Sequence, residues 1–240
     1  MTAPALHLSG RATIGDAPIF GPIEVTVPAG TWTCLLGPSG VGKSTVLRLL
    51  AGLGEEVSFD GTYGAGDGQP LAGRVGLMAQ SDLLMPWRDI VSNVALGAPL
   101  RGQRPDRDRA RALLARVGLA DHADKRPHAL SGGQRQRAAL ARTLMEDRPV
   151  VLLDEPFSAL DARSRALMQE LSAELLSGRT VLHVTHDTAE AARLGQRVLL
   201  MTGDGITEMP VPQDQPPRAY DAPETLTFQG RLHRHLMEAA

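Results

Sequence analysis

The chain has 240 residues and a formal net charge of −2, from 25 lysines and arginines against 27 aspartates and glutamates. Hydrophobic residues make up 42% and charged residues 22%, which are the proportions of a soluble globular protein. This balance argues against bulk electrostatic binding to nucleic acid or to an anionic membrane, and no apolar run approaches the ~20 residues that cross a bilayer.

Three further features of the sequence are informative about the compartment and about candidate residues. Cys34 is the only cysteine, which excludes an intrachain disulfide and fits a reducing compartment. The N-terminus has no basic start followed by a long apolar stretch, so we expect no secretory signal. Only two of the 25 basic residues are lysines, Lys43 and Lys125. Genome composition explains the surplus of arginine but leaves open why position 43 keeps a lysine.

Short strands are predicted in the first part of the chain. Ile23, Val25 and Val27 alternate with polar residues, which is typical of a half-buried strand. A turn at residues 28–30 leads into another predicted strand, Trp32–Leu36. The next elements are expected in the order helix, turn-rich stretch and strand: Thr45–Leu53, Gly61–Pro70 and Val75–Met78.

Residues 86–148 differ from the rest because they hold helical periods and few strand signals. A helix is predicted from Gly132 to about Glu146, with Ser131 as its N-cap. An earlier helix places four apolar residues on one face: Ala110, Leu113, Leu114 and Val117. We therefore expect a helical subdomain inserted in an α/β core.

Strands and helices alternate again after residue 149. Val150–Leu153 is a continuous apolar run, which is typical of a strand buried on both faces. A helix from about Ala162 to Ser177 is expected to bury Leu167, Leu171 and Leu175. A strand is expected at Thr180–Val184, a helix at Thr188–Leu194 and a strand at Val198–Met201. The end of the chain is expected to hold a linker at Pro210–Pro217 and a terminal helix at Glu224–Ala239.

This order of elements predicts one α/β domain over residues 1–240, with a mainly parallel sheet and an antiparallel N-terminal β part. Residues 1–85 and 149–209 would form its core. Residues 86–148 would form the helical subdomain, and residues 210–240 the linker and C-terminal helix.

A glycine-rich motif between a predicted strand and a predicted helix points to phosphate binding. Glycines let the backbone wrap closely around phosphates, and a helix N-terminus adds positive potential. Lys43 would reach the β- and γ-phosphates, and the Ser44 hydroxyl would ligate Mg²⁺. The motif fits G-x-x-x-x-G-K-[ST] in full and predicts a P-loop NTPase core; its residues are Gly37, Pro38, Ser39, Gly40, Val41, Gly42, Lys43 and Ser44, followed by Thr45.

Two carboxylates follow the apolar run at 150–153, at the edge where open α/β sheets bind ligands. Asp154 would hold Mg²⁺, and Glu155 would polarise the attacking water as a general base. By itself the pair fits an acidic strand cap before Pro156 equally well. The phosphate loop earlier in the chain favours the catalytic interpretation.

The helix start at Ser131, Gly132, Gly133 and Gln134 fits a second anion-binding helix N-terminus. A simple capped helix start explains the same residues at least as well on spacing alone. One nucleotide need not use both phosphate-binding elements of the same chain. A head-to-tail dimer would use both, because each element would face the other chain's phosphate loop.

Six motifs in order identify a family. The chain resembles ABC-type ATPases, the nucleotide-binding subunits of transporters, from about residue 6 to 202. The matching segments are GPSGVGKST, the glutamine in LMAQSD, LSGGQRQR, VVLLDEP, SALD and VTHD. The resemblance implies an ATPase that uses ATP and Mg²⁺ and forms a homodimer in its ATP-bound state.

The resemblance also implies roles for further residues. Gln80 would contact Mg²⁺ and the attacking water, and His186 would be the switch histidine at the γ-phosphate. Ser131 to Gln134 would meet ATP across the dimer, and Asp161 would end a loop that communicates between subunits. From the residues alone, a structural histidine is the favoured interpretation of His186, and Asp161 fits the N-cap of the following helix. The expected catalytic set is therefore Glu155, His186, Gln80 and Lys43, and the expected Mg²⁺ ligands are Ser44, Gln80 and Asp154.

One position departs from the family. Members usually place an aromatic residue upstream of the phosphate loop to stack on adenine, and alignment puts Ile14 there. Ile14 can pack against a base but cannot stack on it as an aromatic ring does. Phe20 is nearby in the sequence but does not align with the family's aromatic position. We therefore expect weak base selectivity, or another residue at the base.

The segment Leu83 to Arg88, followed by Asn93 and Val94, resembles importers that serve nitrate, sulfonates, taurine or thiamine-precursor pyrimidines. This likeness implies a separate integral membrane permease, a solute-binding protein and a location at the cytoplasmic face of the cell membrane. Trp87 and Leu84 are candidates for the permease-docking surface, with core packing as the alternative. The solute is not predicted, because it never touches this subunit.

Other functions in the same family are weaker alternatives. An exporter or lipoprotein-releasing complex would use the same motifs. A soluble ABC ATPase acting on DNA or ribosomes would carry long coiled coils or a second nucleotide domain, and this chain has neither of these nor a basic stripe. A regulatory module without turnover is disfavoured by the intact Lys43, Asp154, Glu155 and His186.

Overall fold

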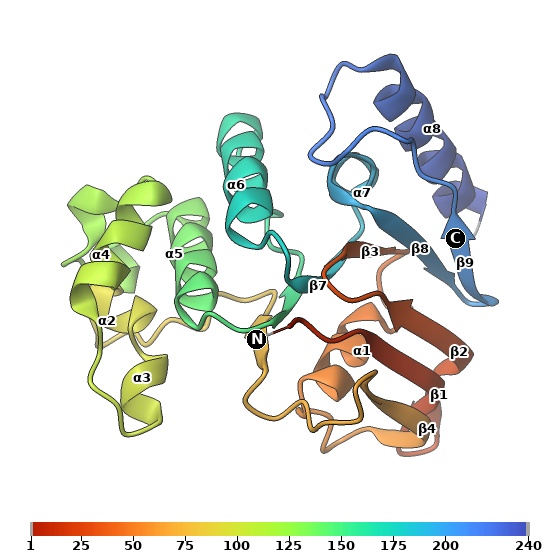
Figure 1. Ribbon diagram of the computed structural model, residues 1–240, viewed down its shortest axis with the longest axis horizontal. Helices are drawn as coiled ribbons and strands as arrows, with labels where there is room; N and C mark the ends of the chain where they lie inside the picture. Colours follow the sequence, from red (N-terminus) through yellow and green to blue (C-terminus); the bar gives the residue numbers. More distant parts are fainter. Residues whose placement is uncertain (1, 239–240) are drawn as a thin grey trace.

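The computed structural model describes residues 2–238, which form two sheets with helices around them (Figure 1). The larger sheet has the strand order β5-β6-β7-β3-β8-β9, and its neighbours are parallel except for the β8–β9 pair. The mainly parallel sheet is therefore confirmed. Its strands are β3 Trp32–Leu36, β5 Val75–Met78, β6 Val150–Asp154, β7 Thr180–Thr185, β8 Arg197–Thr202 and β9 Gly205–Met209.

The N-terminal sheet is antiparallel, as predicted, with the order β2-β1-β4. Leu6 pairs with Val27 and Leu8 with Val25, so the alternating apolar side chains of β1 and β2 share one buried face. The strands of this sheet are β1 Leu6–Ile14, β2 Ala17–Val27 and β4 Ser58–Ala65.

Strand β4 shows that the predicted turn-rich stretch at Gly61–Pro70 was wrong over its first half. A Cβ on Gly61 would collide with the carbonyl oxygen of Ser9, and one on Gly10 would lie 2.8 Å from the Cα of Gly61. These glycines permit two paired strands to approach closely, which is a different use of glycine from a turn.

The larger sheet is buried on both faces, as the apolar run at 150–153 predicted. Val150 and Leu152 pack into one core cluster with β1, β2 and helix α1 (Lys43–Leu50). Val151 and Leu153 pack into the other cluster, with the helices of the opposite face. Helix α1 thus lies between the two sheets (Figure 1).

The opposite face of the sheet is covered by three helices that follow β6, β7 and β9: α6 Ala162–Leu175, α7 Thr188–Leu194 and α8 Pro223–Glu238. The predicted burial of Leu167 on α6 is wrong, because its side chain is 53% exposed. Leu171 and Leu175 are partly buried against the core. The predicted end of the last helix at Ala239 lies outside the described residues.

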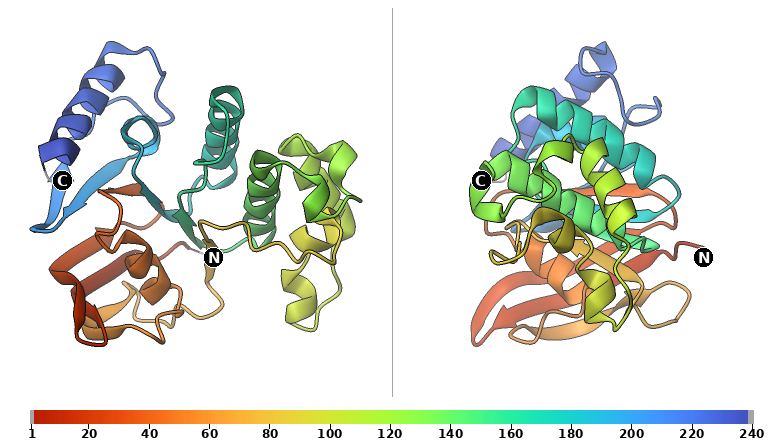
Figure 2. Two further views of the ribbon diagram at one scale, coloured as in Figure 1. Left: turned by 180° about the vertical axis from the view of Figure 1, so that it is seen from behind. Right: turned by 90° about the vertical axis from the view of Figure 1, so that its left-hand side faces the viewer.

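A helical group stands beside the sheets (Figure 2). It comprises α2 Ile90–Val94, α3 Gly97–Leu100, α4 Arg107–Arg116, two 3₁₀ turns at Ala120–His122 and Pro127–Ala129, and α5 Gly132–Met145. Ala110, Leu114 and Val117 are fully buried and Leu113 partly, as the helical period indicated. Because these helices pack mainly on one another, we propose residues 86–148 as a subdomain.

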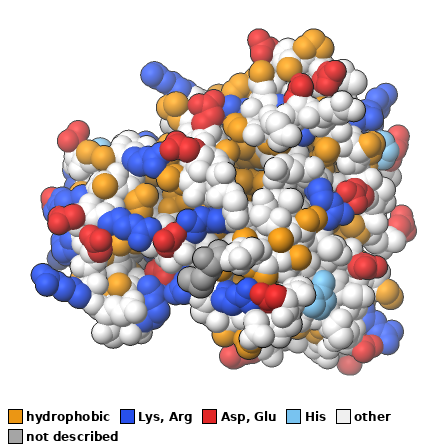
Figure 3. Space-filling view, in the orientation of Figure 1, with side chains coloured by type: hydrophobic (Ala, Val, Ile, Leu, Met, Phe, Trp, Pro, Cys, Tyr) orange, Lys and Arg blue, Asp and Glu red, His pale blue; other side chains and the backbone are white. Residues whose placement is uncertain are grey.

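Basic and acidic side chains lie next to each other over this helical group (Figure 3). Among them, Arg111 contacts Asp124 at 2.6 Å and Arg107 contacts Asp89 at 3.5 Å. The surface charge is therefore locally paired. Within residues 2–238, no helix has the length and apolar character needed to cross a bilayer.

Candidate active site

Residues 37–42 form the loop between β3 and α1, at the carboxyl edge of the larger sheet, and residues 43–45 are the first turn of α1. A Cβ on Gly37 would collide with the carbonyl oxygen of Met201, so only glycine fits there. Gly42 has a positive φ of 104°, and a Cβ on it would lie 2.7 Å from the ring of Phe20. Gly37 and Gly42 are thus required by the packing of the loop against β8 and β2.

Lys43 is buried within this loop, with 6% of its surface exposed. Its Nζ donates hydrogen bonds to the carbonyl oxygens of Gly37 and Pro38, both at 2.7 Å. Burial lowers the pKa of Lys43, and the carboxylates of Glu155 and Asp154 oppose this shift. The ammonium therefore sits at the centre of the loop, next to two acidic side chains.

Ser44 and Asp154 meet although they lie far apart in the sequence. The Ser44 hydroxyl donates to Asp154 Oδ1 at 3.1 Å. Burial raises the pKa of Asp154, and the neighbouring charge of Glu155 raises it further. A hydroxyl and a carboxylate are oxygen donors of the kind that Mg²⁺ takes, so these residues fit that ion.

Glu155, His186 and Gln80 form a second cluster beside Asp154. The Nδ1 of His186 lies 2.9 Å from Glu155 Oε1, and Gln80 Nε2 donates to Glu155 Oε2 at 3.2 Å. These residues follow β6, β7 and β5, which are neighbours in the sheet. Parallel order brings their carboxyl ends together, and the glutamate carboxylate is held from both sides.

Ser131 to Gln134 form a capped helix start. Ser131 Oγ accepts from the Gln134 backbone N–H at 3.3 Å, and Gln134 Oε1 accepts from the Ser131 N–H at 2.8 Å. Ser131 and Gly132 stay exposed and Gly133 is half-buried. The structure therefore does not bring this segment into the Glu155 cluster of the same chain.

Asp161 lies exposed at the start of α6. Its Oδ1 accepts a hydrogen bond from the Ser164 N–H at 2.9 Å, and hydrogen bonds of this kind lower the pKa of its carboxyl. The N-cap expected from the sequence is therefore present.

Ile14 ends β1 in the hairpin and is 51% exposed, whereas Phe20 is 7% exposed beneath the phosphate loop. A cavity of about 290 Å³ lies beside the loop, between the β2 segment and the β8–β9 turn. Its lining includes Pro18, Phe20, Val41, Thr202 and Asp204. The weak selectivity for the nucleotide base that Ile14 led us to expect stays a prediction.

Two residues next to the Glu155 cluster were not predicted from the sequence as part of the site. Gln136 contacts the backbone of Glu155, and Arg165 bridges Leu160 and Asp187. Gln136 belongs to the same LSGGQRQR segment as Ser131, but only its 6% exposure reveals that it points inward. Arg165 has no signal in the sequence beyond its place in the first turn of α6.

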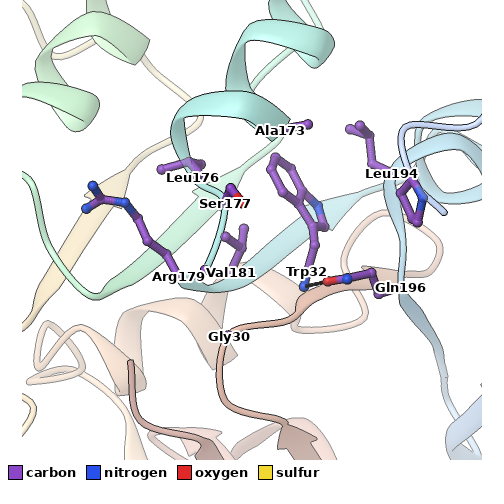
Figure 4. Close-up of a pocket in the computed structure, with 11 residues that line it drawn as sticks. Gly30, Trp32, Ala173, Leu176, Ser177, Arg179, Val181, Leu194 and Gln196 are labelled. Carbon is purple, nitrogen blue, oxygen red and sulfur yellow. Dashed lines mark hydrogen bonds between the residues drawn. The ribbon is translucent and has the colours of Figure 1, made fainter. Parts of the chain in front are cut away.

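A different cavity, of about 200 Å³, lies at the opposite edge of the sheet (Figure 4). Trp32 and Val181, near the starts of β3 and β7, line it together with Arg179, and the Trp32 N–H donates to Gln196 Oε1 at 2.6 Å. Because the candidate residues gather at the carboxyl ends of these strands, this cavity is not part of the site.

An apolar groove of about 430 Å³ separates the core from the helical group. Leu84, a candidate for a docking surface, is 7% exposed and packs in the core, whereas Trp87 is 67% exposed. The groove is lined instead by other residues, chiefly Leu53, Leu77, Leu83, Leu96, Leu100 and Arg142.

The pattern of the ABC transporter family matches residues 20–158. An aliphatic sulfonates import ATP-binding protein of Rhodococcus jostii is 45% identical over 228 residues, covering 91% of this chain and 90% of that protein. An uncharacterised ABC transporter ATP-binding protein of Haemophilus influenzae is 42% identical over 225 residues, covering 91% and 92%.

Solved structures similar to this chain are also ATP-binding proteins of the ABC type. A dimeric ATP-binding cassette in a post-hydrolysis state, bound to ADP and Pi, matches with a TM-score of 0.73 and 27% identity, covering 89% of this chain and 99% of that one. A bacterial Atm1-family ABC exporter with ATP bound matches with a TM-score of 0.78 and 25% identity, covering 96% of this chain and 42% of that one. The chain therefore belongs to the ABC transporter family, as one of its ATP-binding, ATP-hydrolysing subunits.

Proposed function

We propose that this chain is the ATPase subunit of an ABC importer and drives solute uptake through a separate permease. The observation that carries the catalytic part is the Glu155 carboxylate, which is held between His186 and Gln80 beside Lys43 and Asp154. Buried charge, a fixed carboxylate and a glycine-rich loop together suit phosphoryl transfer to water.

The nucleotide phosphates would lie against the loop and helix start of residues 37–45. Lys43 would exchange its two carbonyl partners for β- and γ-phosphate oxygens, since its Nζ already lies inside the loop. Ser44 and Asp154 would hold Mg²⁺, with Gln80 nearby, and the ion would neutralise developing charge on the phosphates.

Glu155 would act as the general base for the attacking water. In hydrolysis the carboxylate takes the water proton as the oxygen bonds to the γ-phosphorus and the bond to the β-phosphate oxygen breaks. His186 keeps the carboxylate oriented through its contact at 2.9 Å and would turn toward the γ-phosphate when nucleotide is bound. The chemistry is mainly positioning and charge stabilisation.

We infer that two copies close head to tail on two nucleotides. The exposed helix start at Ser131 to Gln134 would meet the partner's ATP, and the exposed Asp161 loop would lie against the partner. The dimeric form of the ADP-bound relative supports this arrangement.

The apolar groove would receive a short helix of the permease, and closure of the dimer would draw two such helices together. Docking would place the chain at the cytoplasmic face of the membrane, with a solute-binding protein on the far side. The import names of the relatives favour uptake of an aliphatic sulfonate over export. The exporter match covers 42% of its chain at 25% identity, and export is the second candidate.

Phosphate release by the purified chain tests this proposal. We expect Mg²⁺-dependent hydrolysis of ATP that increases when the permease is present and stops when EDTA removes the metal. Replacing Glu155→Gln should lower the rate about 100-fold or more, because the base is lost while the side-chain volume is kept. Hydrolysis that continues at the wild-type rate in this variant would remove Glu155 from its role.

A further inference from the structure

The side chain of Gln136 crosses from the helical group to the catalytic loop. It lies in α5, one turn after the Ser131 cap, and is 6% exposed. Its Nε2 donates to the backbone oxygen of Glu155 at 3.0 Å, and its Oε1 accepts from the Ala159 N–H at 2.8 Å. One buried amide thus uses both its donor and its acceptor on the loop that follows β6.

The backbone of Glu155 depends on such contacts because it has a φ of +48°. Side-chain-bearing residues rarely adopt this left-handed conformation, so surrounding bonds must hold it. The Glu155 N–H donates to the Val184 oxygen at 2.9 Å, and its carbonyl accepts from Gln136 and from the Ser158 hydroxyl, the latter at 3.1 Å. These bonds hold the backbone from which the Glu155 side chain projects.

The first turn of α5 also packs closely on the same loop. A Cβ on Gly133 would lie 3.1 Å from the Ala159 oxygen and 3.4 Å from a methyl carbon of Leu160. The helix start at residues 131–134 and the loop at residues 155–160 are therefore held together by one close contact and by the Gln136 amide.

We propose that Gln136 is a positioning residue for hydrolysis, which couples the placement of α5 to the orientation of the Glu155 carboxylate. This inference rests on the proposed function, in which Glu155 is the base and the start of α5 meets the partner's nucleotide. Engagement of residues 131–134 by one nucleotide would then adjust the base that serves the other nucleotide.

The test compares Gln136→Met with Gln169→Met. Gln169 is a matched control, since it is 2% exposed in α6 and its Oε1 accepts from Arg193 at 2.7 Å. We expect kcat for ATP to fall about 10- to 100-fold in Gln136→Met with KM unchanged, because misplacement of a reacting group acts on the chemical step. Gln169→Met should keep the wild-type kcat, while both variants lose similar thermal stability.

Two further variants keep the test decisive. Gln136→Glu retains shape and the acceptor for Ala159 but loses the amide donor to Glu155, so it should fold and show the same loss of kcat. In single-turnover hydrolysis, adding Gln136→Met to Glu155→Gln should change the residual rate less than about twofold, because the amide acts through that carboxylate.

The inference would be overturned if Gln136→Met and Gln136→Glu both kept the wild-type kcat. It would also be overturned if Gln136→Met lowered the residual rate of the Glu155→Gln variant by the same factor as it lowers the wild-type rate. Those results leave the proposed function intact as long as the wild-type chain hydrolyses ATP and Glu155→Gln does not. Absence of hydrolysis in the wild-type chain would instead overturn the proposed function itself.

Discussion

The structure explains why position 43 is a lysine in a chain whose other basic residues are nearly all arginines. A chain with almost no lysine keeps one at a position whose Nζ lies 2.7 Å from two loop carbonyls and whose side chain is buried. A compact ammonium on a flexible stem fits between those groups, whereas a planar guanidinium is broader and has a fixed fork. Lys125 is exposed and has no such constraint.

Replacing Lys43→Arg should therefore lower ATP hydrolysis about 100-fold or more, although the charge is conserved. The conservative change Lys125→Arg is the control and should leave the rate within about twofold of wild type. Phosphate release at saturating ATP checks both variants. Near-wild-type hydrolysis by Lys43→Arg would show that charge alone, without the shape of the ammonium, serves the loop.

Individual residues differ in how far their place in the structure can be predicted from the sequence. The motif residues could be placed because strand, glycine loop and helix are local in sequence. Gln136 and Arg165 could not, because their partners at positions 155 and 187 are brought near only by the packed helices and the parallel sheet. The predicted burial of Leu167 was wrong, and the choice between docking and core packing for Leu84 stayed open, for the same reason: burial depends on which elements pack against each face.

At the scale of elements, the strands and helices of the core followed from apolar runs and their periods. Strand β5 was predicted with its observed bounds, and β6 extends one residue further, to Asp154. Strand β4 was obscured by its glycines, which serve close pairing with β1. Strand β9 is a short antiparallel edge strand after a tight turn and has only a weak apolar pattern.

The groove between the core and the helical group leads to a prediction about assembly. Leu100 is 77% exposed at its rim, so a charge there would not disturb the core. We expect Leu100→Asp to weaken binding of the chain to a permease reconstituted in nanodiscs about tenfold or more, with basal hydrolysis unchanged. Leu226→Asp, at a leucine 51% exposed on α8, should bind as wild type.

Titration of binding by surface plasmon resonance would measure this difference. Equal affinities for the two variants would place the permease contact elsewhere than the groove. Loss of basal hydrolysis in Leu100→Asp would indicate that the substitution disturbs the catalytic core.

At the scale of the whole molecule, the proposed ATP site would combine one half from each of two chains. The phosphate loop and Glu155 cluster belong to the core, and the exposed helix start at Ser131 belongs to the helical group. The contact of Gln136 with Glu155 connects these halves within one chain. In the proposed head-to-tail dimer a complete site for ATP would require a second copy, so hydrolysis and dimer closure are expected to be linked.

Light scattering of the Glu155→Gln variant with ATP and Mg²⁺ tests this central claim most directly. Because the variant should bind ATP without hydrolysing it, we predict a stable particle of twice the monomer mass, which returns to monomer when ADP replaces ATP. Adding Ser131→Arg, which places a bulky side chain at the proposed contact with the partner's ATP, should abolish the dimer. A monomer at saturating ATP and Mg²⁺ in the Glu155→Gln variant would contradict the account.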